Sequence, residues 1–323
     1  TETRKPQDGR ITVNIKDRDI DFRVSTVRTI SGEKMVLRVL DKSGAFVSLE
    51  RIGLTENDFQ MLTAMISSAS GILIVCGPTG SGKTSSLYSC LSKINSPEKN
   101  IITIEDPVEF NLAGINQIPV NTKIGVDFVT GLSAIVRQDP DIIMIGEIRD
   151  IKTADIAIQA ALTGHMVFST LHTRDAAGTI TRLINMGVQP FLITSSVVGI
   201  IGQRLVRTIC PNCKKTTDAS IYTGYKKTQL VKSLEEMVEG KLKLHIGEGC
   251  KFCDETGYKG RTGIFEVMGL NEEVRALILQ KSSTEIIQKA ASKAGMTTMK
   301  HDGLQKILSG ITTVDEIARV IDL

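Results

Sequence analysis

The sequence has 323 residues, of which 41% are hydrophobic and 23% are charged, so its length and composition favour two or three domains with a packed core. The formal net charge of +3 is close to balance and does not indicate a nucleic-acid partner. Residues 183–203 carry no charge, but polar residues and Pro190 interrupt the apolar run, which argues against a membrane span.

Residues 10–40 alternate between apolar and polar positions, a pattern typical of half-buried strands. Turn sequences at residues 6–9, 17–19 and 31–33 divide this part and predict a small sheet, or the last part of one. We expect a linker over residues 43–55, followed by a helix from about Glu56 to Ser67.

Apolar strands and helices then alternate along the chain. Because these strands are apolar on both faces and are separated by helices, we predict an α/β fold with a parallel sheet covered on both sides. The predicted strands cover residues 72–76, 101–105, 142–145 and 166–171, and the predicted helices cover residues 85–94, 126–136, 151–163 and 174–186.

The first of these strands runs into a glycine-rich sequence that fits G-x-x-x-x-G-K-[ST]. Its glycines let backbone N–H groups point at phosphate oxygens, Lys83 adds a positive charge for the β- and γ-phosphates, and Thr84 offers a hydroxyl to Mg²⁺. The strand before it and the helix after it favour a nucleotide-binding loop, the P-loop of residues 77–84, over a chance glycine-rich turn. The predicted nucleotide-binding residues are Gly77, Pro78, Thr79, Gly80, Ser81, Gly82, Lys83 and Thr84.

Two predicted strands end in acidic residues, where a nucleotide-hydrolysing site needs carboxylates for Mg²⁺ and water. Glu105 is the last residue of the second strand, Asp106 and Glu109 come just after it, and Glu147 follows the third strand. Glu147 comes after four apolar residues and a glycine, the build expected for a hydrolytic carboxylate beside the γ-phosphate. The alternative is that these acids cap helices or pair with Arg149.

Two histidines flank the fourth predicted strand. His172, at its C-terminal end, is well placed to sense the γ-phosphate, whereas His165 is as readily explained by a structural turn. No acidic cluster lies at metal-ligand spacing beside either residue, so a histidine metal site is not expected.

The cysteines outside the P-loop region form two C-x-x-C pairs, Cys210/Cys213 and Cys250/Cys253, separated by 36 residues. Two such pairs provide four thiolates for a tetrahedral structural Zn²⁺, and four protein ligands leave no open coordination position for catalysis. The alternative is a set of free thiols or a redox dithiol. Between the pairs lies a lysine-rich, partly helical insert at residues 225–240, and after them come a predicted strand at residues 260–267 and helices at 271–280, 283–293 and 313–323.

In this order the motifs resemble those of the bacterial traffic ATPases of the type II secretion and type IV pilus-extension family. The resemblance covers essentially the whole chain. It rests on residues 6–10, 21–26, 32–38, 77–84, 104–109, 137–150 and 162–173, and on the four cysteines with residues 260–263.

The resemblance implies a fold and a set of site residues. Residues 1–42 would be the C-terminal part of a small PAS-like domain, and residues 56–323 a RecA-like ATPase domain that includes a zinc subdomain at 208–262 and C-terminal helices at 270–323. Glu105 to Glu109 matches the family's Asp box, Glu147 its Walker B catalytic glutamate, and His165 to His172 its His box. Arg23 and Arg38 match arginines that reach from the small domain toward the nucleotide in an arginine-finger role.

The resemblance also implies a function. The family forms homo-hexamers that hydrolyse ATP with Mg²⁺, carry structural Zn²⁺, and act in the cytoplasm on inner-membrane platform proteins through nucleotide-driven domain motion. Retraction ATPases of the same superfamily lack the four-cysteine element, so its presence here indicates pilus extension or secretion. The family's docking domain for the membrane platform is not recognised in this sequence.

Two other classes of function stay open at this point. One is a nucleic-acid motor with a zinc element, against which the near-neutral charge and the lack of a basic stripe argue. The other is a scaffold that binds ATP with little turnover, against which the presence of Glu147 argues.

Overall fold

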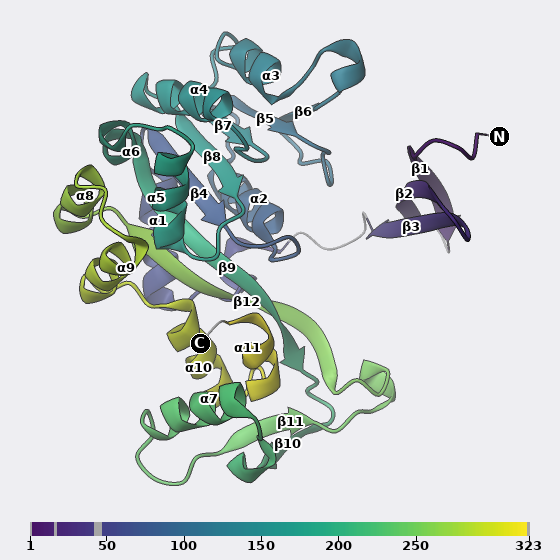
Figure 1. Cartoon of the computed structure of the whole chain (residues 1–323), viewed down its shortest axis with the longest axis vertical. Coiled ribbons are helices and arrows are strands. Elements are labelled where there is room, and N and C mark those ends of the chain that lie inside the picture. Colours follow the sequence, from purple (N-terminus) through teal and green to yellow (C-terminus); the bar gives the residue numbers. More distant parts are fainter. Residues whose placement is uncertain (1, 16–17, 42–46, 322–323) are drawn as a thin grey trace.

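A small antiparallel sheet forms the N-terminal part of the computed structural model, which describes residues 2–15, 18–41 and 47–321. Its strands β1 (Gln7–Ile15), β2 (Arg18–Thr29) and β3 (Gly32–Asp41) lie in the order β1-β2-β3 and stand apart from the larger body in Figure 1. The strands predicted within residues 10–40 are confirmed. Part of the predicted linker, residues 42–46, lies outside the described residues, so the division at 43–55 stays a prediction.

The larger body is built on a seven-stranded sheet in the order β12-β9-β4-β8-β7-β5-β6. All neighbouring strands are parallel except β12, which pairs antiparallel with β9. The predicted α/β fold with a parallel sheet is therefore confirmed, except that the edge strand β12 is antiparallel. The strands are β4 (Gly71–Cys76), β5 (Ile101–Glu105), β6 (Asn116–Pro119), β7 (Ile142–Ile145), β8 (Met166–Leu171), β9 (Val197–Ile209) and β12 (Tyr258–Gly269).

Both faces of this sheet are buried, which explains its continuous apolar strands. In β4, Ile72 and Ile74 belong to one hydrophobic core, whereas Leu73 and Val75 belong to another. The first core includes α3 (Phe128–Ile135), α4 (Ile151–Leu162), α5 (Ala176–Asn185), α6 (Pro190–Ser196), α8 (Glu272–Leu279) and α9 (Thr284–Lys293). The second includes the 3₁₀ turn η1 (Leu49–Arg51), α1 (Glu56–Ile66) and α2 (Lys83–Ile94).

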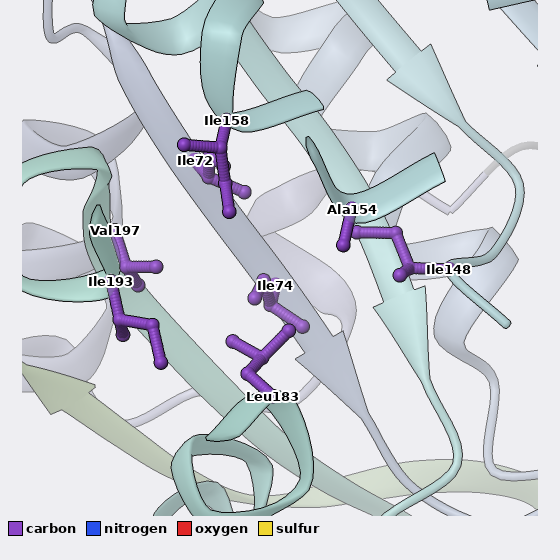
Figure 2. A pocket seen from close by; sticks show the side chains of 8 residues that line it. All are labelled: Ile72, Ile74, Ile148, Ala154, Ile158, Leu183, Ile193 and Val197. Atoms are coloured by element: carbon purple, nitrogen blue, oxygen red, sulfur yellow. The ribbon is translucent and has the colours of Figure 1, made fainter. Parts of the chain in front are cut away.

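The first core contains one small cavity of about 10 Å³. Figure 2 shows its lining, in which side chains from β4, α4, α5 and α6 point toward one another. The lining is apolar and the space is no larger than a water molecule needs, so the cavity is a packing feature and not a ligand site.

Strands β9 and β12 continue beyond the sheet toward a separate module (Figure 1). The module contains the antiparallel pair β10 (Lys214–Thr217) and β11 (Leu244–Gly247), and a third hydrophobic core packs α7 (Tyr225–Glu235) with α10 (Met299–Leu308) and α11 (Val314–Val320). Among the described residues, no helix has both the length and the apolar character needed to cross a bilayer.

Several elements differ from the sequence prediction or were not predicted. The helix expected at 126–136 begins at Phe128, because Asp127 caps it by accepting the Thr130 N–H. Strand β9 was not predicted from the sequence, and its first half lies in the uncharged stretch of residues 183–203. A Cβ at Gly199 would lie 2.4 Å from Met65 Sδ and one at Gly202 would lie 2.7 Å from side-chain atoms of Glu266, so a larger residue at either position would require these side chains to move.

Candidate functional site

The P-loop connects β4 to α2 at the carboxyl end of the parallel strands. Gly80 and Gly82 have φ of 79° and 88°, values that favour glycine. Gly77 is required for space as well, since a Cβ there would lie 2.5 Å from both the Gln203 carbonyl oxygen and Ser81 Oγ. Lys83 and Thr84 then begin α2, the helix that the sequence places behind the loop.

Lys83 is a buried cation, with 8% of its surface exposed. Its Nζ donates to the carbonyl oxygens of Gly77 at 2.8 Å and Pro78 at 3.1 Å, and burial lowers its pKa. Among the described residues it forms no ion pair, and the buried Ser81 Oγ of the same loop has no hydrogen-bond partner. A buried positive charge and an unsatisfied hydroxyl in one loop suit an anionic ligand such as phosphate.

His172 and Glu147 extend this site from the ends of β8 and β7. His172 Nδ1 lies 3.5 Å from Lys83 Nζ, and His172 Nε2 lies 3.4 Å from Glu147 Oε2. Burial and the charge of Lys83 lower the pKa of His172, which favours a neutral imidazole. A neutral ring that accepts from Lys83 at Nδ1 carries its proton on Nε2, the nitrogen that faces Glu147. Glu147 Oε1 also accepts from Arg149 at 2.5 Å.

Glu105 lies in a closed hydrogen-bond network, only 2% exposed. Its Oε2 accepts from the Tyr88 hydroxyl, and its Oε1 accepts from Thr103 Oγ1 at 2.6 Å and from Gln117 Nε2 at 3.1 Å. Tyr88 in turn accepts the main-chain N–H of Glu109 at 3.4 Å. The structure therefore ties the Asp box to helix α2 through Tyr88, while the catalytic role predicted for Glu105 stays a prediction.

Glu109 connects this region electrostatically with the small sheet. Burial raises the pKa of its carboxyl group, while the charges of Arg38 and Arg23 act in the opposite direction. These two exposed arginines are direct cross-strand neighbours in the sheet, and Arg10 pairs with Arg23 in the same row. Arg10 is thus a neighbour of Arg23 and Arg38 that the sequence did not single out, because the pairing register of the strands defines it.

The two histidines of the predicted His box lie at opposite ends of β8. His165 precedes the strand, and its Nδ1 lies 2.8 Å from the Ala160 carbonyl oxygen at the end of α4. Only His172 reaches Lys83 and Glu147, as its position after the strand predicted.

Gln203 is a residue of this site that the sequence did not single out. It is 2% exposed, its Oε1 accepts from Ser86 Oγ of α2 at 2.8 Å, and its Nε2 lies 2.9 Å from where a Cβ of Gly82 would be. It thus supports the P-loop from β9. Its one sequence signal is that it is the first polar residue after the apolar first half of β9.

The four cysteines of the two C-x-x-C pairs come together at the end of β9 and before β12. All four sulfur atoms lie within 4.8 Å of one another, with 3.8 Å between Cys210 and Cys250, 3.8 Å between Cys213 and Cys253, and 3.6 Å between Cys250 and Cys253. Four thiolates around a tetrahedral Zn²⁺, each at about 2.3 Å, lie about 3.8 Å apart, so the set fits zinc in ligand type and spacing.

Backbone donors support the same interpretation. The N–H groups of Cys250 and Gly257 donate to Cys253 Sγ at 3.2 and 3.3 Å. Burial acts to raise the pKa of the Cys253 thiol, but these donors and the neighbouring cysteines lower it to about 6, whereas burial raises the pKa of Cys213 in the same cluster. Gly257 packs against Gly247, where a Cβ would lie 2.0 Å from the Gly257 carbonyl oxygen, so two glycines bring the cysteine loops together.

Comparison with known proteins shows which family the chain matches. The family model described as "Type II/IV secretion system protein" matches residues 1–319. Type II secretion system protein E of Pseudomonas aeruginosa is 45% identical over 319 residues, which are 99% of this chain and 62% of that protein. Type IV pilus assembly ATPase PilB of the same species is 46% identical over 321 residues, which are 99% of this chain and 56% of that protein. The chain thus spans about three fifths of the length of these relatives.

Solved structures agree on the fold. The pilus retraction motor PilT, determined with bound ADP, superposes with a TM-score of 0.70 at 24% identity, covering 99% of this chain and 78% of that chain. The Legionella pneumophila ATPase DotB gives a TM-score of 0.68 at 22% identity, covering 98% of this chain and 77% of that chain. The resemblance drawn from the sequence motifs is confirmed: the chain belongs to the type II/IV secretion system protein family.

Proposed function

We propose that this chain is the motor region of an ATPase that powers type II secretion or type IV pilus assembly by hydrolysing ATP to ADP and phosphate. The observation that carries the proposal is the contact series Lys83–His172–Glu147 at the carboxyl ends of β4, β8 and β7. It combines a phosphate-binding cation with a carboxylate that can orient water, on the edge of the sheet where such ligands bind. The names of the type II secretion and pilus assembly relatives support the biological role.

In this proposal each residue has a distinct task. Lys83 leaves the carbonyl oxygens of its own loop and binds phosphate oxygens, and the Thr84 hydroxyl would hold Mg²⁺, which neutralises phosphate charge when bound. Glu147 accepts a hydrogen bond from the attacking water and orients it. His172, between Lys83 and Glu147, transmits the presence of the γ-phosphate from one to the other.

Residues outside this series complete the proposed site. Glu105 and Glu109 act as Asp-box acids, with Glu105 held by Tyr88 and Glu109 facing the small sheet. Arg23 and Arg38 stabilise charge in the transition state from that sheet, because their shared face is electrostatically coupled to Glu109. Movement of the small sheet against the ATPase body would then follow the nucleotide state.

The proposed metal at the cysteine cluster is structural. Cys210, Cys213, Cys250 and Cys253 would hold Zn²⁺ with all four positions filled by protein, so the ion would stabilise the module and take no part in hydrolysis. We further propose a cytoplasmic homo-hexamer that acts on inner-membrane platform proteins, as the family resemblance implies, and we expect no direct contact with nucleic acid.

Nucleotide binding by the Lys83→Ala variant tests this proposal. We expect removal of the buried ammonium to weaken binding of a fluorescent ATP analogue by at least about tenfold and to abolish turnover, because charge-assisted phosphate contacts are lost. Lys232→Ala, on the exposed face of α7, is the control for loss of one positive charge. Equal ATP affinity and turnover in Lys83→Ala and wild type would refute the proposed site.

A further inference from the structure

Arg204 of β9 lies beside the P-loop, although no motif in the sequence marks it. Gly202, two residues earlier, pairs with Cys76, the last residue of β4 before the loop. The Arg204 guanidinium donates through NH1 to the Gln203 carbonyl oxygen at 3.1 Å and through NH2 to the Arg174 carbonyl oxygen at 2.6 Å. Its head group therefore spans the space between β9 and the turn that follows His172.

The carbonyl group that anchors Arg204 also touches the P-loop. A Cβ on Gly77 would lie 2.5 Å from the Gln203 carbonyl oxygen, so the first glycine of the loop packs directly on this group. The Gln203 carbonyl group thus contacts both the P-loop and the Arg204 guanidinium. Arg204 is therefore a second cation beside the loop whose Gly77 carbonyl oxygen accepts from Lys83.

The charge of Arg204 is not balanced by a carboxylate. Its two contacts are neutral carbonyl groups, which leave most of its N–H donors for a ligand, and no ion pair between described residues includes it. Arg207, three residues on in the same strand, differs in this respect: it pairs with the buried Glu316 at 2.7 Å and lies over the Tyr258 ring at 4.0 Å. Arg207 is a structural arginine, whereas Arg204 keeps its charge for a further partner.

Two cations at one loop repel each other, and an anion between them removes that cost. In agreement, burial and the charge of Arg204 both lower the pKa of Lys83. Phosphate is the anion that a planar guanidinium binds in a fixed, multidentate geometry.

We propose that Arg204 is a second phosphate-binding residue of the nucleotide site, held ready by the carbonyl groups of Gln203 and Arg174. This inference rests on the proposed function, because it takes the phosphates of a nucleotide as the ligand. It adds a binding residue from β9, which lies on the other side of β4 from the strands that precede His172 and Glu147.

Equilibrium binding of fluorescent ATP and ADP analogues tests the inference in wild type, Arg204→Ala, Arg204→Gln and the control Arg182→Ala, which removes an exposed charge from α5. The amide introduced by Arg204→Gln would retain N–H donors for the two carbonyl groups but not the charge. We expect both Arg204 variants to bind about tenfold more weakly, with a shallower dependence of affinity on salt, while Arg182→Ala binds as wild type. A loss for both nucleotides would assign Arg204 to the α- or β-phosphate, and a loss for ATP alone to the γ-phosphate.

Other outcomes overturn the inference. If Arg204→Gln binds with wild-type affinity and Arg204→Ala binds weakly, Arg204 acts only through its hydrogen bonds to the two carbonyl groups. If both variants bind with wild-type affinity, Arg204 has no role in nucleotide binding. If these variants bind as wild type while Lys83→Ala does not, the inference fails and the proposed function stands. If wild type binds neither nucleotide, both fail.

Discussion

The P-loop and the cysteine cluster both adjoin strand β9, but they differ in how completely their polar groups are paired. At the P-loop, among the residues that the structure describes, the buried Lys83 forms no ion pair and Ser81 Oγ has no hydrogen-bond partner. At the cluster, four sulfur atoms within 4.8 Å of one another form a complete ligand set for one ion. A site that binds and releases a ligand keeps polar groups without protein partners, whereas a structural metal site fills every coordination position with protein ligands. Substitutions should therefore change ligand binding at the first kind of site and stability at the second.

The largest effect is expected at the cluster, because the zinc proposed there would contribute directly to folding. In Cys250→Ser we expect loss of zinc by elemental analysis and a fall of about 10 °C or more in the melting temperature of the module. The reason is that losing the metal would remove several kcal/mol from the free energy of unfolding. Cys90→Ala, a buried thiol in α2 outside the cluster, is the control and should keep its zinc. Absence of zinc from untreated wild-type protein would contradict the structural role.

The next effect concerns Glu316, which holds β9 to α11 between the two sites. Burial acts to raise the pKa of Glu316, but hydrogen bonds from Arg319 and Arg207 lower it to about 2. Since the folded-state pKa lies below the ordinary value, this carboxylate stabilises the fold above about pH 4.5, and the contribution is lost as the pH falls toward 2. Glu316→Gln should therefore destabilise the protein by about 3 kcal/mol at pH 7 and flatten its acid unfolding.

Asp315→Asn is the matched control, because Asp315 forms a half-exposed pair with Lys227 that is worth less than about 1 kcal/mol. Denaturant unfolding at pH 7 and pH 3 measures both variants. Equal stabilities of the two variants at pH 7 would mean that the buried pairing of Glu316 has no special weight.

Substitution of His172 is expected to change stability less than the variants above but to lower turnover. Its pKa is lowered by burial and by Lys83, so the neutral ring that accepts from Lys83 is retained down to pH values below its ordinary 6.5. His172→Ala should lower kcat by about tenfold to a hundredfold with little change in melting temperature, because the half-exposed ring contributes little packing.

Wild-type turnover should also fall as the pH drops below the lowered pKa of His172, where the protonated ring can no longer accept from Lys83. That acidic limb should be absent in His172→Ala. His165→Ala is the control at the opposite end of β8, and a kcat as low as that of His172→Ala would show that the distinction between the two histidines is wrong.

Local sequence rules predicted the parts of the molecule that depend on local chemistry. The apolar run of β4, the glycines of the P-loop and the spacing of the cysteine pairs each carry their structural reason within a few residues. Strand β9 was beyond such rules, because Gly199 packs against Met65 and Gly202 against Glu266, which lie far away in the sequence. Gln203 and Arg204 were beyond them for the same reason, since Gln203 accepts from Ser86 and Arg204 donates to the Arg174 carbonyl oxygen. The family resemblance supplied Arg23 and Arg38, and the register of β2 and β3 explains why they belong together.

The central claim is that the edge containing Lys83, His172 and Glu147 hydrolyses ATP. The most direct test is Mg²⁺-dependent ATP hydrolysis over a range of protein concentrations, in wild type, in Glu147→Gln and in the charge-matched control Glu235→Gln at an exposed position of α7. We predict specific activity that rises with concentration as subunits assemble, is retained in Glu235→Gln, and is lost in Glu147→Gln while ATP binding persists. Turnover in Glu147→Gln equal to that of wild type would contradict the claim.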